Sequence, residues 1–199
     1  MPEMSAVAKM ACTNLPYRLL AQHFLVGWGL QGIELRGEAL EIGSGSGAMA
    51  VALLKRFPEL RVVATDYDPD MVRTMSQRLA RFGDRATAQQ ADAANLPFET
   101  GRFDAVLTFA MLHHVGDDQK ALAEAVRVLR TGGRLLGYDV THAARLAAQQ
   151  TQGHGHHGHS GHAGRTLPLE EVLSQLPIAN LGTRHSLGGR VLRFTATKA

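Results

Sequence analysis

Residues 38–47 read EALEIGSGSG, a short apolar run followed by three alternating glycines. The apolar run is typical of a buried strand, and the next segment, SGAMAVALLKRF (46–57), has helical periodicity and stops at Pro58. Glycines at a strand-to-helix junction allow a tight turn and a close approach of the backbone to a ligand, which also meets the free N–H groups of the helix start. The stretch therefore predicts an α/β fold with a cofactor site at its first turn.

The same alternation of strand and helix continues along the chain. A second helix opens at Asp68, whose carboxylate can cap it, with Pro69 at the first helical position, and it runs to Gly83. A third helix is expected over 117–130 and is closed by Thr131-Gly132-Gly133. The strands are predicted at 38–43, 61–66, 86–91, 103–109 and 134–140. Strands that alternate with helices indicate a parallel sheet with helices on its faces.

The two ends of the chain depart from this alternation. Residues 15–30 are predicted to form an amphipathic helix. Its apolar side chains are expected to pack in the core rather than to line an acceptor pocket, namely Leu19, Leu20, Phe24 and Trp28. A polar, glycine-rich segment at 141–165 is followed by a short helix near 168–176 and two strands, 178–186 and 190–197, joined by Gly188-Gly189. The glycine pair indicates a hairpin, so an antiparallel hairpin is expected to close the sheet.

Composition narrows the class of protein. The 199 residues are 45% hydrophobic, and the 21 basic and 18 acidic residues give a formal charge of +3 without a basic stripe. We therefore expect one domain and no specific nucleic-acid surface. The single cysteine, Cys12, excludes an internal disulfide, and we see no membrane-spanning stretch and no secretory signal, so a cytoplasmic location is expected.

The glycine loop fits two kinds of cofactor. Gly43, Gly45 and Ala48 match the dinucleotide pattern G-x-G-x-x-A, and Asp66 lies at about the distance expected for a residue that binds a ribose diol. These residues alone leave a nicotinamide cofactor and a methyl donor open. Glu41 lies two positions before the first glycine, and it bears on the choice only through a resemblance to a known family.

Residues 38–140 resemble class I S-adenosylmethionine-dependent methyltransferases, most closely the small-molecule branch of the ubiquinone/menaquinone-biosynthesis type. The resemblance rests on an ordered set of motifs: an acidic residue before G-x-G-x-G, then ATDYDPDMV, ADAANLPF, FDAVLTFAMLHHV and AVRVLRTGGRLLGYD. It implies a Rossmann-like fold with a mostly parallel seven-stranded sheet, helices on both faces and a C-terminal antiparallel hairpin. It also implies methyl transfer from S-adenosyl-L-methionine to a small-molecule acceptor.

The resemblance assigns the methionine end of the cofactor to the first turn. Gly43, Gly45 and Gly47, with Ser44 between them, would lie along the methionine part. Glu41 would orient its amino-acid end through water or loop N–H groups.

The adenosine end would lie on the next two strand ends. Asp66 would accept both ribose hydroxyls, and Tyr67 would pack on the adenine. Asp92 would accept from the adenine amino group, and Ala93 would supply a backbone contact.

Methyl transfer from a sulfonium needs proximity and alignment, and it needs a base only where the acceptor must lose a proton. His113 and His114 are the first candidates for that base, because they follow the fourth strand and an imidazole titrates near neutrality. Either can instead cap the turn. Asp139, Tyr138 and His142 follow the fifth strand and could orient an acceptor.

The segment GHGHHGHSGHAG (153–164) is not explained by the resemblance. Its five imidazoles could chelate zinc, nickel or copper, although a tolerated loop with incidental metal affinity is the favoured interpretation. The candidate ligands are His154, His156, His157, His159 and His162.

The sequence predicts one methyltransferase domain, 1–199. It would consist of a helical cap (1–36), a cofactor-binding core (38–140), the glycine- and histidine-rich loop (141–165) and a C-terminal helix and hairpin (166–199). Two other functions stay open from the residues alone: an NAD(P)-dependent oxidoreductase, and a cofactor- or metal-binding regulatory module without turnover. The sequence leaves the acceptor, the methylated atom and the oligomeric state undetermined.

Overall fold

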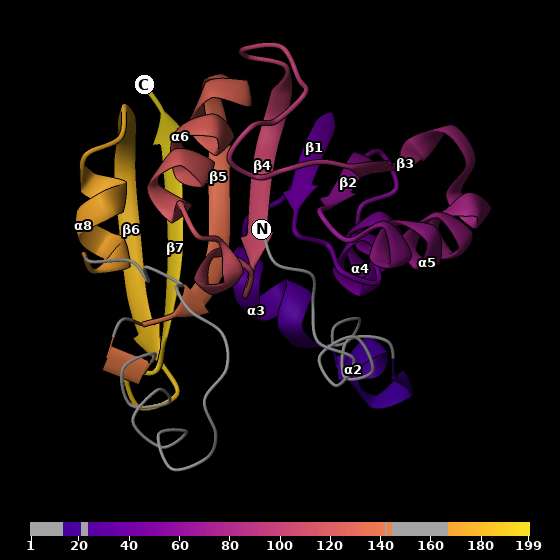
Figure 1. The fold of residues 1–199 in the computed structure, drawn as a ribbon, viewed down its shortest axis with the longest axis horizontal. Helices are drawn as coiled ribbons and strands as arrows, with labels where there is room; N and C mark the ends of the chain where they lie inside the picture. The colour runs from indigo at the N-terminus through magenta and orange to yellow at the C-terminus, as the bar shows by residue number, and fades with distance from the viewer. Residues whose placement is uncertain (1–13, 21–23, 142, 145–166) are drawn as a thin grey trace, which may run out of the picture.

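The computed structural model of the protein describes residues 14–20, 24–141, 143–144 and 167–199. Seven strands form one sheet in the order β3-β2-β1-β4-β5-β7-β6 (Figure 1). The strands are β1 Glu38–Ile42, β2 Arg61–Asp66, β3 Ala86–Gln90, β4 Phe103–Phe109, β5 Leu129–Val140, β6 Ile178–Ser186 and β7 Val191–Lys198. Strands β1 to β5 pair in parallel, and β7 runs antiparallel to both β5 and β6. The predicted fold class is confirmed, including the hairpin, whose Gly188 and Gly189 both have positive φ.

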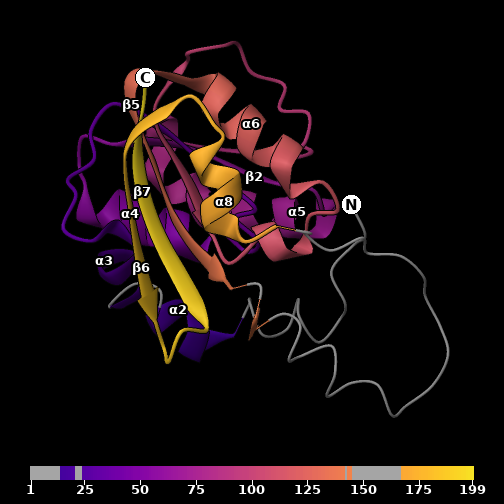
Figure 2. The same ribbon diagram turned by 90° about the vertical axis from the view of Figure 1, so that its left-hand side faces the viewer.

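The helices lie on both faces of this sheet. They are α2 Leu15–Leu20, α3 Val26–Leu30, α4 Ala48–Arg56, α5 Pro69–Leu79, α6 Asp118–Val128 and α8 Leu169–Ser174, with 3-10 helices η2 Ala80–Arg85 and η3 Leu112–His114. One apolar cluster packs α6 and α8 on one face, and a second packs α3, α4 and α5 on the other. Figure 2 shows α6 and α8 separated from α3 and α4 by the strands. None of the helices in the described ranges combines the length and apolarity needed to span a bilayer.

The order of the strands positions the site. β1 pairs with β2 on one side and with β4 on the other, so the connections that follow β1 and β4 leave the sheet toward opposite faces. A crevice at such a switch point, outside the carboxyl ends of the strands, is where open α/β sheets bind ligands. In Figure 1 the carboxyl ends of β1, β4 and β5 point downward, toward α3.

Two predicted boundaries are wrong at the start of β5. The third helix ends at Val128 rather than at 130, and the strand begins at Leu129 rather than at 134, so the Gly132-Gly133 turn lies within the strand. The reason is strand pairing. Leu129 pairs with Phe103 on β4, and the register then shifts so that Ala105 pairs with Arg134, which leaves the two glycines in the irregular part of the strand. Pairing with a neighbouring strand therefore decides this boundary, which helical periodicity cannot report.

The N-terminal segment differs from the prediction in burial. Within 15–30 the structure has the helices α2 and α3, and residues 21–23 lie outside the described part of the chain. Leu19, Leu20 and Phe24 are exposed, so placing them in the core was wrong.

The helix α3 is attached firmly to the sheet. Gly29 brings its backbone onto the rings of Phe109 and Tyr138, since a Cβ on Gly29 would lie 3.1 Å from Phe109. Arg193 on β7 stacks over Trp28 and donates from Nη1 to its carbonyl oxygen. The segment that precedes β1 is thereby held near the carboxyl ends of β4 and β5.

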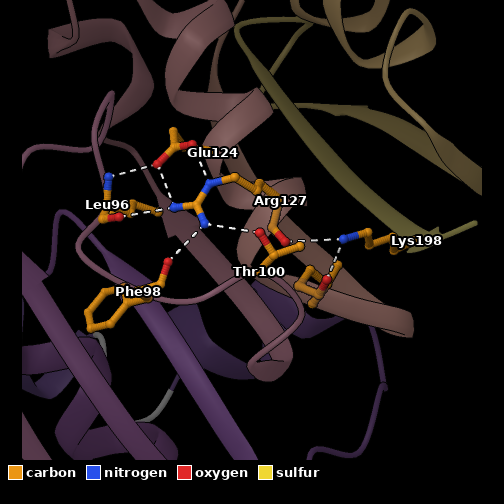
Figure 3. Close-up of polar contacts among 7 residues, drawn as sticks. Leu96, Phe98, Thr100, Glu124, Arg127 and Lys198 are labelled. Carbon is orange, nitrogen blue, oxygen red and sulfur yellow. Dashed lines mark hydrogen bonds and ion pairs between the residues drawn. The ribbon is translucent and has the colours of Figure 1, made fainter.

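The connection between β3 and β4, residues 91–102, is held by one ion pair on α6 (Figure 3). Glu124 and Arg127 pair with each other, and the Arg127 guanidinium donates to the carbonyl oxygens of Leu96 and Phe98 at 3.0 and 2.8 Å. Glu124 in turn accepts the N–H of Leu96 at 2.8 Å. Lys198 donates to the carbonyl oxygen of Arg127 and so connects the end of β7 to the same point. This network positions the segment that carries Asp92.

We predict that Arg127→Met lowers the free energy of unfolding by about 2 kcal/mol, because the carbonyls of Leu96 and Phe98 lose a charged donor. The matched control is Arg130→Met. Arg130 pairs with Asp104 at the surface, and that change should stay within about 1 kcal/mol. Urea denaturation of both variants measures the difference, and equal losses would contradict the proposed anchoring role.

Candidate functional site

The loop after β1 has the backbone that the sequence predicted. Gly43, Gly45 and Gly47 all have positive φ, and Gly47 is the N-cap of α4. A Cβ on Gly43 would come within 2.7 Å of the Met111 side chain, so glycine is required there by the neighbouring segment after β4. A Cβ on Gly45 would meet open space. The loop is therefore closely packed at its first glycine and open at its second.

Asp66, at the end of β2, holds this loop. Its Oδ2 accepts the N–H of Gly45 at 2.7 Å, and its Oδ1 accepts the N–H of Asp68 at 2.9 Å. Burial raises the pKa of Asp66 above its ordinary value, and these two N–H donors partly offset that rise. Sequence reasoning assigned Asp66 only to a ligand, yet the residue also organises the protein. Each carboxylate oxygen can accept more than one hydrogen bond, so capacity for ligand hydroxyls remains.

Glu41 is a buried acid directly beneath the loop. It is 1% exposed, and its Oε2 has no hydrogen-bond partner among the described residues. Burial raises the pKa of Glu41 to about 7; the Ser44 hydroxyl opposes this rise and the charge of Asp66 adds to it. The hydroxyl oxygen of Ser44 is also buried, and it makes no hydrogen bond of normal geometry with any of the described residues. Two polar groups at the loop are thus left for a ligand to satisfy.

The remaining predicted cofactor residues lie on the next two strand ends. Tyr67 follows Asp66 and is half-buried. Asp92 follows β3 in a tight turn, where its Oδ1 accepts the N–H of Ala94 at 2.9 Å, and Ala93 is buried. All of the predicted cofactor residues therefore lie at the carboxyl edge of β1, β2 and β3.

The two candidate bases lie in η3, after β4. The rings of His113 and His114 are 3.9 Å apart between centroids, and His113 is half-buried while His114 is exposed. The Nδ1 of His113 is 2.8 Å from Oδ1 of Asp139, which is fully buried at the end of β5. The structure thus brings together His113 and Asp139, a pairing that the sequence did not predict. The local motif carries no signal for it, since the two residues are 26 positions apart.

Several sequence candidates cannot be placed. The five histidines of 153–164, together with Cys12, His23 and His142, lie outside the described residues. Within 14–20, 24–141, 143–144 and 167–199 no group of three or more His, Cys, Asp or Glu residues could hold a metal ion. Metal binding by the histidine-rich loop stays a prediction.

The arrangement discriminates between the two cofactor classes left open above. A dinucleotide would place a pyrophosphate at the start of α4, beside two buried acids, Glu41 and Asp66. A ligand with an ammonium group and hydroxyl donors would instead satisfy the free Oε2 of Glu41 and the remaining acceptor capacity of Asp66. The site therefore fits a cationic ligand such as an amino-acid-bearing nucleoside better than a dinucleotide.

The raised pKa of Glu41 makes the stability of the ligand-free protein depend on pH. The folded protein binds a proton there up to about pH 7, whereas the unfolded chain releases it near 4.5. The free energy of unfolding should therefore fall as the pH rises between these values, by about 3 kcal/mol in total.

We predict that Glu41→Gln, which has no charge to bury, lacks this loss and is the more stable protein above pH 7. Chemical denaturation of both proteins at pH 5, 6, 7 and 8 measures the effect. A constant difference between them across this range would contradict the raised pKa.

Comparison with known proteins identifies the fold and the matched region. A family model described as a methyltransferase domain matches residues 39–133. A demethylmenaquinone methyltransferase of Thermus thermophilus is 34% identical over 128 residues, which cover 62% of this chain and 58% of the relative. A ubiquinone/menaquinone biosynthesis C-methyltransferase of Desulfotalea psychrophila is 33% identical over 109 residues, covering 55% of this chain and 44% of the relative. The chain thus matches about half the length of these curated relatives.

Solved structures agree with the fold along nearly the whole chain. A SAM-dependent methyltransferase from Aquifex aeolicus superposes with a TM-score of 0.71 at 18% identity, covering 99% of this chain and 100% of the other. The phosphoethanolamine N-methyltransferase 2 of Haemonchus contortus, solved with S-adenosylhomocysteine, superposes with a TM-score of 0.68 at 18% identity, covering 93% and 53%. Together, these comparisons show that residues 39–133 are similar to a methyltransferase domain and to methyltransferases of ubiquinone and menaquinone biosynthesis, and that the chain has the fold of the solved methyltransferases.

Proposed function

We propose that the protein transfers a methyl group from S-adenosyl-L-methionine to a small, hydroxylated aromatic acceptor of the quinol type. The observation that carries the cofactor is the unsatisfied, buried Glu41 beneath an open glycine loop, with Asp66 beside it. The acceptor class is supported by the names of the relatives, which act in menaquinone and ubiquinone biosynthesis.

The bound cofactor would supply a methyl group already activated on a sulfonium sulfur, so the protein's task is mainly to bind and align. Ionised Glu41 pairs with the ammonium of the methionine part, which the loop from Gly43 to Gly47 cradles. Asp66 accepts the ribose hydroxyls and keeps the loop in shape through its bond to Gly45.

The residues that would hold the adenine are at two strand ends. Tyr67 would pack on the ring, Asp92 would accept from its amino group, and Ala93 would offer a backbone contact. The turn that carries Asp92 is fixed by its own bond to Ala94, and the segment after it is fixed by Arg127. Binding therefore needs little rearrangement at this end, which favours affinity.

The acceptor lies at the carboxyl ends of β4 and β5, beside η3. His113 is near this edge, and its imidazole is the group best suited to remove a proton from a hydroxyl. We further propose that all 199 residues form one methyltransferase domain, since strands from residue 38 to residue 198 share one sheet.

We predict micromolar binding of S-adenosylhomocysteine to the metal-free protein, measured by calorimetric titration, and no comparable binding of NAD. Asp66→Asn keeps an acceptor for the N–H of Gly45 but loses the charge, so affinity should fall by about tenfold or more. Asp84→Asn is the control. The Asp84 side chain is 86% exposed and pairs with Arg61 at the amino end of β2, so this variant should bind S-adenosylhomocysteine as the wild type does.

Binding of NAD without S-adenosylhomocysteine would overturn the proposal. Transfer itself is measured with a tritiated methyl donor and a panel of hydroxylated naphthalenes and benzenes. Turnover confined to amines or thiols would contradict the acceptor class and leave the cofactor assignment intact.

A further inference from the structure

The contact between His113 and Asp139 is a buried polar pair at the acceptor edge of the sheet. The two atoms, Nδ1 and Oδ1, are 2.8 Å apart. The side chain of Asp139 is fully buried, whereas that of His113 is 22% exposed. One end of the imidazole is therefore fixed inside the protein while the ring still reaches the surface.

The other contacts of Asp139 show which role Nδ1 has. Its Oδ2 accepts the N–H of Leu112 at 2.7 Å, and its Oδ1 accepts the N–H of Val140 at 2.7 Å. Asp139 thus accepts a hydrogen bond from a backbone N–H of η3 and from one of β5. A carboxylate surrounded in this way pairs with Nδ1 as a donor, so a neutral imidazole carries its hydrogen on Nδ1 and its lone pair on Nε2.

The segment that carries His113 also contacts the cofactor loop. Met111, two residues earlier, packs so closely on Gly43 that a Cβ there would lie 2.7 Å from it. Between β4 and Met111, Ala110 has a φ of 52°, a strained conformation for a residue with a side chain. The packing of Met111 on Gly43 holds η3 in one position against the loop and offsets the strain at Ala110.

The charged and titratable groups around the ring come from three elements. β5 supplies Asp139, and η3 itself supplies His114, whose ring contacts that of His113 at an interplanar angle of 41°. The helix α6 packs against η3 and carries Asp117, Asp118 and Lys120 in its first turn. Of the N-terminal groups of α6, Asp117 caps the helix by accepting the N–H of Lys120.

A second histidine–carboxylate pair provides a comparison. His185 and Glu170 are 3.0 Å apart at the surface, with side chains 57% and 35% exposed, and the contact is made by Nε2. A pair of this kind in water contributes little and orients nothing. The buried, triply bonded Asp139 differs from it in both respects.

We propose that Asp139 is a positioning residue that holds His113 as the Nδ1–H tautomer, so that Nε2 faces a hydroxyl-bearing acceptor as its general base. This inference rests on the proposed methyl transfer and specifies it: the acceptor is a molecule that must lose a proton. The acceptor O–H proton passes to Nε2. The electron pair left on oxygen, or delocalised onto a ring carbon, forms the bond to the methyl carbon. Where a ring carbon is methylated, that carbon then loses its hydrogen as a proton and the oxygen regains one, so the net release of one proton is unchanged.

The bond from the methyl carbon to sulfur breaks, and its electrons remain on sulfur as the positive charge of the sulfonium is lost. The imidazolium then releases its proton to water. One proton is produced for each methyl group transferred, and no oxidant or reductant is required.

The first test is the tautomer itself, read by long-range 1H–15N NMR of the histidine rings in the full-length, cofactor-free protein. The His113 signals are assigned by their absence in His113→Gln. The wild type should show hydrogen on Nδ1. In Asp139→Asn an NH2 group replaces one of the two acceptor oxygens and the negative charge is lost, so the preference for hydrogen on Nδ1 should fall.

The second test is turnover with 1,4-dihydroxynaphthalene as the acceptor. Asp139→Asn and His113→Gln should each lower kcat by about 100-fold or more, with unchanged affinity for S-adenosylhomocysteine, and the double variant should be no worse than either. Glu170→Gln, at the surface pair, should match the wild type in every assay.

Hydrogen on Nε2 in the wild type would overturn the inference, and so would a reduced preference for Nδ1 in Asp139→Asn with kcat unchanged. His113→Gln leaves both backbone bonds of Asp139 in place, so it decides the question if Asp139→Asn fails to fold. Failure of the proposed function would look different, because S-adenosylhomocysteine would then not bind at all.

Discussion

The carboxylate of Asp66 is the contact on which the site depends. It joins the N–H of Gly45, in the loop after β1, to the N–H of Asp68, at the start of α5. A loop with three glycines in positive φ loses much conformational entropy on folding, and a charged acceptor bonded to its middle offsets part of that cost. Asp66 is the last residue of the buried strand β2, so the sheet sets the position of the loop.

Two buried acids beneath one loop are unfavourable in the ligand-free protein. Burial raises the pKa of both Glu41 and Asp66, and the charge of Asp66 adds to the rise at Glu41. A cationic ligand reverses the balance, because it favours the ionised form of the acids that burial disfavours. Binding and stability are thus opposed here, as is common where a site must remain polar.

At the carboxyl ends of β4 and β5, different contacts hold the edge of the sheet together. There the helix α3 lies close to β4 and β5 through Gly29, and η3 is fixed by the packing of Met111 against Gly43. Asp139 then connects η3 to β5 by accepting from Leu112 and from His113. The cofactor residues and the candidate base consequently belong to one rigid edge, so the distance between donor and acceptor sites is set by the sheet rather than by loops.

The sequence alone determined the elements whose causes are local. The glycine loop, the Asp68 cap with Pro69 behind it, and the hairpin at Gly188-Gly189 each depend on a few adjacent residues, and each formed as predicted. The candidate residues at the strand ends received their roles from the family resemblance, and the local sequence alone left two kinds of cofactor open.

Contacts between distant segments were decided only by the tertiary structure. Pairing with β4 moved the start of β5 to Leu129, and packing left Leu20 and Phe24 exposed although their i, i+4 spacing fits one helical face. The bond from Asp139 to His113 and the hold of Arg127 on Phe98 join residues 26 and 29 positions apart. No local pattern reports such contacts, since each arises from the strand order and from which helix covers which face.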